Sequence, residues 1–411
     1  MRIAIIGAGV SGLASARRCL ENGFEPVVYE RSKIVGGTWI YDERIGLDEF
    51  GLPIHTSIYQ NLKTNLPKEL MDYPNFPYKD LDDVSFLRPR QVLEYIEQFT
   101  EHFGLKKHIR FCNFVTSVEK SENAWQVIAE DLLTKMSHTE YYDAVMVCNG
   151  HLTLPSVPQI QGLDKFTGVH IHSHDYRAPI KFKNMNVLVI GAGPSGVDIS
   201  MDVGKFANQV YLSHHRPKLL EIKFLNNIVH KPDVEYFSGK SVFFKDQTVQ
   251  TVDAIIHCTG FNIGLPFLKP SCGINVVDGK LITPLHKSII NINNPSMGFI
   301  GFLYNTLVNR VFDLQVRYYL EYLRKNHFAG EAADWMSATS THTAGNNLSN
   351  YCKSLASEEI KIEPIPRIIF EMYKGCQELR HKYFQTYHTA VFRTVDSDSY
   401  LIEIDGQNCK F

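Results

Sequence analysis

Apolar runs, glycine-rich turns and amphipathic stretches alternate along this chain from its first residues. The run at 3–6 (Ile-Ala-Ile-Ile) has apolar side chains on both faces, which is typical of a strand inside a parallel sheet. A glycine-rich stretch at 7–12 (Gly-Ala-Gly-Val-Ser-Gly) follows at once, and residues 13–21 have a helical pattern. The next apolar run, 27–30, ends in a glutamate. This succession predicts a strand, a tight turn, a helix and a second parallel strand.

The glycine spacing of this first unit favours a nucleotide site. Gly7 permits a tight turn, Gly9 lets the backbone approach a diphosphate, and Gly12 lets the helix pack on the strand. Free N–H groups at the helix N-terminus would then face the phosphates. Glu30 stands 21 residues after Gly9, where a carboxylate can accept hydrogen bonds from ribose hydroxyls. The unit is interpreted as a site for FAD or NAD, the alternative being a purely structural turn.

The same pattern recurs in the middle of the chain. The apolar run 186–190 leads into Gly-Ala-Gly-Pro-Ser-Gly at 191–196, and the second strand of this unit covers 209–213. No acid ends that strand; Ser213 and Arg216 stand in its place. A carboxylate there would repel a 2′-phosphate, whereas a guanidinium can pair with it. The second unit is therefore interpreted as a site for NADP, the alternative for Arg216 being a solvated surface charge.

Two further strands indicate how the chain connects the two units. The runs at 142–148 and 252–258 each end in a small residue and a glycine, and a loop with proline follows each. We interpret them as the places where the chain crosses between domains. The predicted fold is α/β, with two dinucleotide-binding, Rossmann-like domains and the NADP domain inserted into the other. The predicted bounds are 1–164 and 275–411 for the first domain and 165–274 for the NADP domain.

The other elements follow from shorter patterns. Residues 89–103 have the period of an amphipathic helix, and 306–326 also favours a helix. The stretch 328–357 is polar with little periodicity. Alternation at 387–395 and 400–404, around a turn rich in aspartate and serine, predicts a hairpin.

Composition and charge exclude several classes of protein. The 411 residues are 44% hydrophobic and carry a formal charge of −2, with no basic run of the kind that binds nucleic acid. No apolar stretch reaches the ~20 residues of a membrane helix, so no membrane anchor is expected. The chain begins in a strand without a signal peptide; we expect a soluble protein, cytoplasmic, or secreted if a signal was removed.

Cysteine and histidine spacing give no metal or dithiol site. The eight cysteines include no C-x-x-C pair, so free thiols are expected. His170, His172 and His174 alternate and would share one face of a strand, which resembles a metal triad. The expected chemistry needs no metal, and none is predicted. Two dinucleotides in one chain imply hydride transfer between them, and the absence of a close cysteine pair argues against a disulfide reductase. An oxidase or a quinone reductase remains open on these residues alone.

A longer motif narrows the function. Residues 166–176 match F-x-G-x-x-x-H-x-x-x-Y, and on this match the chain resembles the flavin-containing monooxygenases. Residues 30–39 (Glu-Arg, then Gly-Gly-Thr-Trp), 64–71 (Thr-Asn-Leu-Pro-Lys-Glu-Leu-Met), 258–261 and 313–317 also resemble that family, so the likeness extends over about residues 1 to 325. Baeyer–Villiger enzymes carry Trp where this chain has Tyr, at the last position of the motif. The chain looks most similar to insect-type members, among which are oxygenases of pyrrolizidine alkaloids.

The resemblance implies a reaction and two cofactors. NADPH would reduce FAD, and the reduced flavin would capture dioxygen as a C4a-hydroperoxide. A small lipophilic tertiary amine or thioether would then take the distal oxygen. Such chemistry requires a dry pocket with fixed donors rather than a strong acid or base. The alternatives are a Baeyer–Villiger enzyme, an NADPH oxidase, or a flavoprotein redox sensor without catalysis. A homo-oligomer is possible, and substrate contacts are expected from 285–310 and 328–360.

The resemblance also implies roles for individual residues. Asn65 matches the family's active-site asparagine and would donate to the peroxide or the nicotinamide; from the residues alone it could equally be a turn residue before Pro67. Trp39 would lie beside the flavin, or else serve as a core anchor. Tyr176 and His172 would support the link between domains. The expected cofactor-binding residues are Gly7, Gly9, Ser11, Gly12, Glu30, Arg31, Gly37, Thr38, Trp39, Thr64, Asn65, Val115, Gln315, Gly191, Gly193, Pro194, Ser195, Gly196, Ser213, Arg216 and Thr259.

Overall fold

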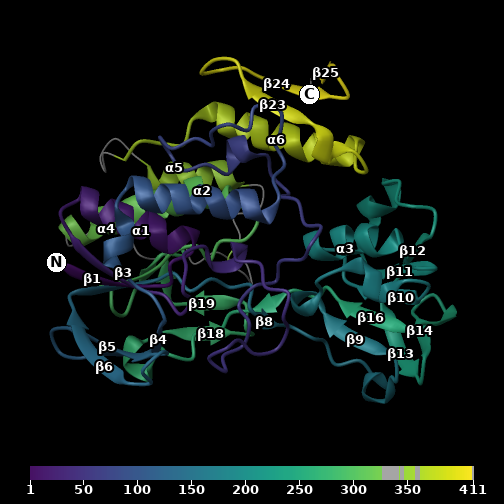
Figure 1. Ribbon diagram of the computed structural model, residues 1–411, viewed down its shortest axis with the longest axis horizontal. Helices are drawn as coiled ribbons and strands as arrows, with labels where there is room; N and C mark the ends of the chain where they lie inside the picture. The colour runs from purple at the N-terminus through teal and green to yellow at the C-terminus, as the bar shows by residue number, and fades with distance from the viewer. Residues whose placement is uncertain (326–341, 343–346, 357–361, 410–411) are drawn as a thin grey trace.

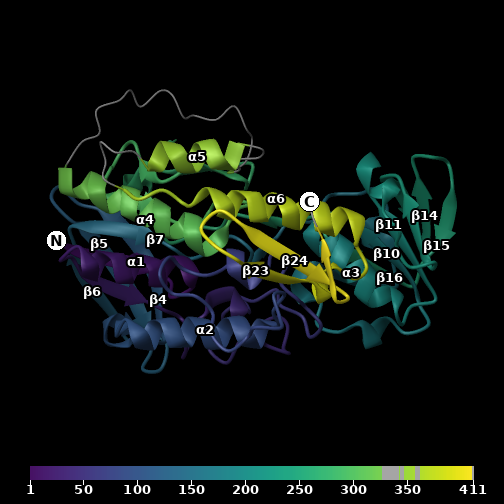
Figure 2. The same cartoon turned by 90° about the horizontal axis from the view of Figure 1, so that it is seen from above.

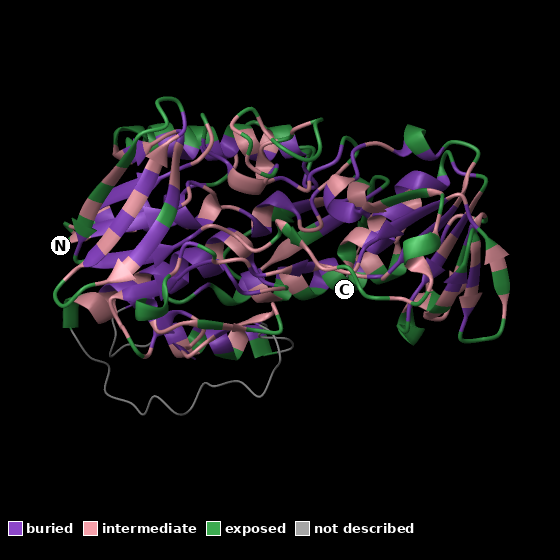
Figure 3. Cartoon of the chain, turned by 90° about the horizontal axis from the view of Figure 1, so that it is seen from below, coloured by how far each residue is buried: buried purple, intermediate pink, exposed green. Residues whose placement is uncertain are grey.

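The computed structural model describes residues 1–325, 342, 347–356 and 362–409. The chain forms a larger α/β body that contains the N-terminus and a smaller α/β body beside it (Figure 1). Each body is built around its own sheet, and buried residues follow the strands of both sheets (Figure 3).

The larger body has a seven-stranded sheet in which β1, β2, β3, β7 and β22 run parallel. Its central strands are apolar on both faces because helices cover one side and a second layer of strands covers the other. In spatial order the strands are β20 (Leu285–His286), β21 (Ile290–Asn291), β22 (Met297–Phe299), β7 (Ala144–Val147), β1 (Arg2–Ile6), β2 (Glu25–Tyr29) and β3 (Ile109–Arg110).

Helices and a small antiparallel sheet complete this body. α1 (Val10–Glu21) packs against α4 (Val308–Lys325), and α2 (Pro89–His102) lies in the same layer. The sequence prediction of helices at 89–103 and 306–326 is thereby confirmed, apart from Asn326, which lies outside the described residues. On the other face are β4 (Asn113–Lys120), β5 (Trp125–Asp131) and β6 (Ser137–Tyr142), together with the hairpin β18 (Asn275–Val277) and β19 (Leu281–Thr283).

The smaller body repeats the parallel arrangement with five strands. The helix α3 (Pro194–Gly204) follows the second glycine turn and packs on this sheet. In spatial order the strands are β12 (Ile228–Lys231), β11 (Gln209–Ser213), β10 (Asn186–Ile190), β16 (Ala254–His257) and β9 (Val169–His172); the meander β13 (Val234–Ser238), β14 (Ser241–Phe244) and β15 (Val249–Thr251) covers its other face.

The predicted crossing strands are β7 and β16, one in each sheet. The segments that follow them pair with each other as β8 (Leu154–Pro155) and β17 (Phe261–Asn262), so the two crossings lie side by side. The chain therefore connects the two sheets in the way that the predicted α/β fold requires.

The C-terminal part forms a layer that reaches from the larger body towards α3 (Figures 1 and 2). It contains α6 (Arg367–Lys382), a 3-10 turn at Tyr387–Thr389, and the strands β23 (Val391–Thr394), β24 (Tyr400–Ile404) and β25 (Gln407–Cys409). The hairpin of β23 with β24 confirms the sequence prediction, but its first strand begins only at Val391 because residues 387–389 close a turn instead.

Two other sequence patterns have a different outcome. Within the polar stretch 328–357, residues Leu348–Leu355 form the helix α5, whose apolar side chains pack into the large core; most of the remaining residues there lie outside the described ones. The three alternating histidines do not share a strand face, since β9 ends at His172 and His174 lies in the following 3-10 turn. No three metal-ligating side chains converge within the described ranges.

Two chemical expectations can be compared directly with the structure. All eight cysteines lie in described segments, and each is a free thiol, as predicted. In the part of the chain that the structure covers, no helix is long and apolar enough to cross a membrane.

Candidate functional site

The first glycine turn requires glycine at two positions. Gly7 has a φ of +105°, and a Cβ atom there would lie 2.8 Å from the Cys148 carbonyl oxygen. A Cβ atom on Gly12 would lie 1.9 Å from the carbonyl oxygen of Gly7. These contacts place the start of α1 directly against β1 and β7, as a dinucleotide turn requires.

A second glycine segment faces this turn. A Cβ atom on Gly37 would come within 3.0 Å of the Gly9 Cα atom, and the Gly36 N–H donates to the Ala8 carbonyl at 3.1 Å. Bare backbone from two segments therefore borders the N-terminus of α1. This cradle fits the diphosphate of a flavin nucleotide, because only backbone N–H groups can approach it so closely.

Glu30 is held beside the same turn. Its carboxylate is buried and accepts from the Ala8 N–H and from the Ser32 N–H, each at 2.7 Å. The position at the end of β2 is the one that sequence analysis assigned to a ribose contact. Trp39 packs at the edge of the large core, and Thr38 accepts from the Thr56 hydroxyl through its carbonyl at 2.7 Å.

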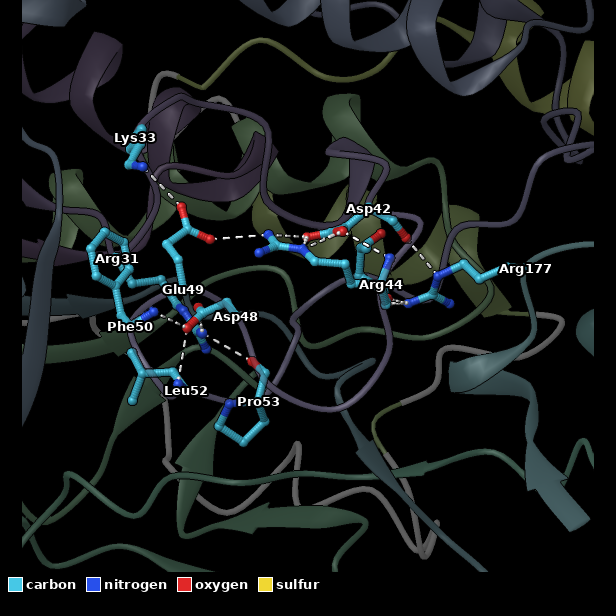
Figure 4. Close-up of polar contacts among 11 residues, drawn as sticks. Arg31, Lys33, Asp42, Arg44, Asp48, Glu49, Phe50, Leu52, Pro53 and Arg177 are labelled. Carbon is cyan, nitrogen blue, oxygen red and sulfur yellow. Dashed lines mark hydrogen bonds and ion pairs between the residues drawn. The ribbon is translucent and has the colours of Figure 1, made fainter.

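Arg31 points away from the turn into an adjoining loop (Figure 4). Its guanidinium donates to the Asp48 carboxylate at 2.6 Å and to the Pro53 carbonyl at 2.9 Å. In the same loop Glu49 bridges Lys33 and Arg44. The charge of Arg31 therefore stabilises this loop, and contact with a cofactor would have to come from its backbone.

Three other expected cofactor residues are hydrogen-bonded within the protein, and a fourth is buried in a strand. The Ser11 hydroxyl donates to the Cys148 carbonyl at 3.4 Å, and the Leu87 N–H donates to the Thr64 hydroxyl at 3.0 Å. Gln315 is fully buried between the Gly301 N–H and the Tyr351 hydroxyl. Val115 is buried in β4. Gln315 can act on a cofactor only by fixing Gly301, which lies against Ser11.

The second glycine turn has the geometry of the first. Gly191 has a φ of +97°, and Cβ atoms on Gly191 and Gly196 would lie 2.5 Å from the Cys258 carbonyl oxygen and 1.9 Å from the Gly191 carbonyl oxygen. At Gly193 a Cβ atom would meet no described heavy atom within 4 Å, so this backbone is open. Pro194 is the first residue of α3, where its missing N–H costs no hydrogen bond.

The residues expected around this second nucleotide differ in accessibility. Ser213 is buried and its hydroxyl donates to the Pro232 carbonyl at 2.8 Å, whereas Arg216 is exposed just beyond β11. Thr259 donates to the Ser156 carbonyl at 2.5 Å, and Ser195 is half-buried at the start of α3. Of these side chains, Arg216 is the one open to a phosphate.

Two tyrosines fix α3 to the segments that join the two bodies. The Tyr176 hydroxyl donates to Asp202 at 2.8 Å, and the Tyr59 hydroxyl donates to Asp198. Asn61 also donates to Asp202, at 3.0 Å. Burial, with Asp202 close by, raises the pKa of Asp198 to about 7. The Tyr59–Asp198 bond joins the two bodies, whereas Tyr176 and Asp202 both lie within residues 165–274, so the expected linking roles of Tyr176 and His172 stay predictions.

A cavity of about 490 Å³ lies where three parts of the chain meet. Its walls are the segment around Asn65, one side of α3 from Pro194 to the residues just after its end, and residues of the C-terminal layer between 380 and 389. The cationic side chains on these walls are Lys63, Arg88, Lys205 and Arg380. Burial, with Arg88 and Lys205 nearby, lowers the pKa of Lys63.

Sequence reasoning missed the C-terminal contribution to this cavity. The Tyr387 hydroxyl lies 3.5 Å from the Asn65 side-chain oxygen, although 322 residues separate them. No local pattern marks such a contact. Among the described residues of 285–310 and 328–360, the ranges expected to line the substrate site, none lines this cavity.

Comparison with known proteins agrees with these features. The family described as FMO-like, flavin-binding monooxygenase-like, matches residues 1–220, which is more than half of the chain. The chain belongs to this family of flavin-containing monooxygenases. The relationship inferred from the fingerprint is confirmed, and the protein is an enzyme, an NADPH-dependent flavin monooxygenase of the kind that oxygenates nitrogen or sulfur.

Individual flavin-containing monooxygenases align over most of the chain. Senecionine N-oxygenase of Tyria jacobaeae is 34% identical over 87% of this chain and 82% of its own length. The Arabidopsis thaliana flavin-containing monooxygenase FMO GS-OX1 is 36% identical over 73% of this chain and 68% of its own. The structure of S-allyl-L-cysteine S-oxygenase from Allium sativum superposes with a TM-score of 0.85, at 29% identity over 94% of both chains.

Proposed function

We propose that this monooxygenase binds FAD at the first glycine turn and NADPH at the second, and that it oxygenates the nitrogen of tertiary amines or the sulfur of thioethers. In this assignment residues 1–164 and 275–411 form the FAD domain and 165–274 the NADP domain. The single observation that carries the proposal is the shared cavity, in which Asn65 from one domain faces the first turn of α3 from the other.

The flavin assignment rests on the cradle at the first turn. Gly9 and Gly37 leave backbone exposed to a diphosphate, and Glu30 ends the second strand where a ribose would lie. Bound flavin supplies the capacity to activate dioxygen and to transfer one of its atoms. The protein's part is to hold the ring, exclude water and place the substrate.

The NADPH assignment rests on charge and position. The open backbone at Gly193 and the N-terminus of α3 can receive a diphosphate, and Arg216 is exposed at the end of β11 for a 2′-phosphate. The cavity continues from Pro194 to Asn65 along a wall that includes Lys63 and Lys205. A nicotinamide dinucleotide lying along it would keep its phosphates near cations and its nicotinamide near Asn65.

Asn65 suits the site because its side chain is a neutral donor. A carboxylic acid at this position could supply a proton and release peroxide, whereas an amide can orient the reacting groups without doing so. The nearby acid Asp198 is engaged by Tyr59. We therefore assign Asn65 an orienting role and require no acid or base from the protein.

The substrate class rests on the relatives. Senecionine N-oxygenase, by its name, acts on an alkaloid nitrogen, and S-allyl-L-cysteine S-oxygenase acts on a thioether. Both atoms are soft nucleophiles, so one oxygenating site can serve either. Pyrrolizidine alkaloids are the first compounds to examine.

The test uses the purified full chain. Its flavin is released and identified, and NADPH consumption is compared with products formed from a pyrrolizidine alkaloid, a thioether and a cyclic ketone. We expect FAD, and close to one N-oxide or sulfoxide per NADPH. Lactone formation from the ketone, or hydrogen peroxide as the sole product with all three compounds, would contradict the proposal.

A further inference from the structure

The C-terminal layer packs directly on the segment that carries Asn65. The buried Tyr387 reaches the Asn65 Oδ1 atom at 3.5 Å, and the Cys376 thiol lies 3.9 Å from the Asn65 carbonyl oxygen. Further along, the Phe392 N–H donates to the Ser85 hydroxyl at 2.8 Å. The layer is therefore anchored on both sides of this contact.

The hydrogen-bond direction at Tyr387 can be assigned from its partners. The Arg380 guanidinium lies over the Tyr387 ring, 5.3 Å from its centroid, and an amide oxygen can only accept, so the Tyr387 hydroxyl donates in its contact with Asn65. The hydroxyl hydrogen is then available to Asn65, whose Oδ1 atom is the acceptor. With Oδ1 held in this way, the Asn65 NH₂ group is the end of the amide that remains for a ligand in the cavity.

His388 packs against Tyr387 at the edge of the cavity. Their ring centroids lie 3.9 Å apart with the ring planes tilted by 32°, and the His388 ring also lies edge-on to Phe86. Burial, with Lys63 and Arg380 nearby, lowers the pKa of His388 to about 3, so the ring is neutral at physiological pH. The His388 ring therefore restricts the Tyr387 ring without adding charge to the cavity.

We propose that Tyr387 is a positioning residue, which acts through Asn65. Tyr387 selects the amide orientation in which Asn65 donates into the cavity, and His388 packs beside the Tyr387 ring. The proposal rests on the orienting role of Asn65 given above. Without the Tyr387 hydroxyl the amide can rotate by half a turn and present its oxygen instead, and a carbonyl oxygen cannot donate.

The test compares Tyr387→Phe, Asn65→Ala and the double variant in the flavin-loaded enzyme. Product and hydrogen peroxide per NADPH are measured, and NADP⁺ binding is titrated from the change in the flavin absorbance spectrum. We expect Tyr387→Phe to lower product per NADPH about fivefold, the loss of one ordinary hydrogen bond, with the flavin still bound. In the Asn65→Ala background the same substitution should change nothing further.

Tyr400→Phe is the matched control. It removes a hydroxyl from the same layer, one that donates to the Glu371 carbonyl at 3.0 Å outside the cavity. The amount of product per NADPH, which we call coupling, should therefore stay unchanged. A second pair of variants applies if the Tyr387→Phe protein does not fold. Tyr387→His retains a ring N–H that can donate to Asn65 and should keep more product per NADPH than Tyr387→Leu, which has no donor. Equal product per NADPH from both would contradict the proposal.

The outcomes separate this proposal from the function on which it rests. If Asn65→Ala uncouples the enzyme but Tyr387→Phe does not, or if their effects multiply in the double variant, only the positioning role is overturned. If Asn65→Ala itself leaves coupling intact, the result contradicts both the orienting role of Asn65 and the positioning role of Tyr387. Loss of coupling in Tyr400→Phe equal to that in Tyr387→Phe would show a general packing effect and would also overturn the proposal.

Discussion

The Arg177 guanidinium donates to the backbone carbonyl of Asp42 at 2.6 Å, and so joins the segment after the fingerprint tyrosine to the loop near the first glycine turn (Figure 4). The same group donates to the carbonyls of Arg44 and Thr56. Arg177 is only 2% exposed, and burial lowers its pKa. It also donates to the carbonyls of His174 and Tyr176, so one buried cation satisfies carbonyls from both bodies of the fold.

Removing this cation should destabilise the enzyme. In Arg177→Met, several buried carbonyls lose charged donors, each bond contributing about 1.5–3 kcal/mol. We expect the free energy of unfolding in urea to fall by about 3 kcal/mol or more. The exposed Arg90, substituted in the same way, should change it by less than about 0.5 kcal/mol. If Arg177→Met and the wild type unfold at the same urea concentration, Arg177 does not stabilise the fold.

An acidic group at position 65 should uncouple the reaction. Asn65→Asp retains the size of the side chain but replaces the NH₂ donor by an oxygen that either carries charge or releases a proton. We expect NADPH oxidation to continue while hydrogen peroxide replaces most of the product. The check is the ratio of product to NADPH, and a ratio near one in the variant would argue against the role of Asn65.

The two glycines of the second turn should respond differently to alanine. In Gly196→Ala the new methyl group would lie 1.9 Å from the Gly191 carbonyl oxygen, so the smaller domain should be destabilised. Gly193→Ala meets no described protein atom and should fold normally, yet its methyl group would occupy the approach of the diphosphate. We expect at least a tenfold weaker NADP⁺ affinity with normal flavin content. Unchanged affinity in Gly193→Ala would place the dinucleotide elsewhere.

Arg216 should give the enzyme its preference for NADPH over NADH. Its exposed guanidinium can pair with a 2′-phosphate that NADH lacks. We expect Arg216→Ala to raise KM for NADPH about tenfold and to leave KM for NADH nearly unchanged. The neighbouring exposed Lys218, changed to alanine, serves as the control. An equal effect of Arg216→Ala on both nucleotides would refute this specificity role.

Acid should destabilise the fold through its buried histidines. Burial lowers the pKa of these rings far below 6.5, so between pH 6.5 and about 4 the unfolded chain binds more protons than the folded one. Stability is therefore fully present above pH 6.5 and is lost as the pH falls. The histidines concerned are His55, His151, His172, His257 and His342, with pKa values of about 4, and His388, with a pKa of about 3.

The measurement is the urea midpoint at pH 7.5, 6.5 and 5.5. Asp72 and Asp198, whose pKa values burial raises to about 6 and about 7, act in the opposite direction but are fewer. His257→Met should flatten the dependence, because His257 is fully buried, whereas His215→Met should not, because His215 is exposed. A midpoint that rises towards pH 5.5 would show that the carboxyl groups dominate.

Features that depend on neighbouring residues could be predicted from the amino-acid pattern alone. Both glycine turns, the strands and helices around them, the helix at 89–102 and the crossing strands β7 and β16 follow from local spacing. The fingerprint at 166–176 identified the family for the same reason, because its residues are consecutive along β9 and the 3-10 turn that follows it.

Contacts between groups far apart in the chain could not be predicted in this way, because they depend on how the whole chain packs. Residues 387–389 have the alternation of a strand, yet they form a turn because Tyr387 is held at Asn65, 322 positions away. The sequence allowed the Arg31 guanidinium to contact a cofactor, but in the structure it donates hydrogen bonds to Asp48 and Pro53. Periodicity reports only which face of an element is buried, whereas the partner that covers the face is set by the packing of the whole chain. The cavity around Asn65, built from three separate segments, is therefore a property of the fold and not of any motif.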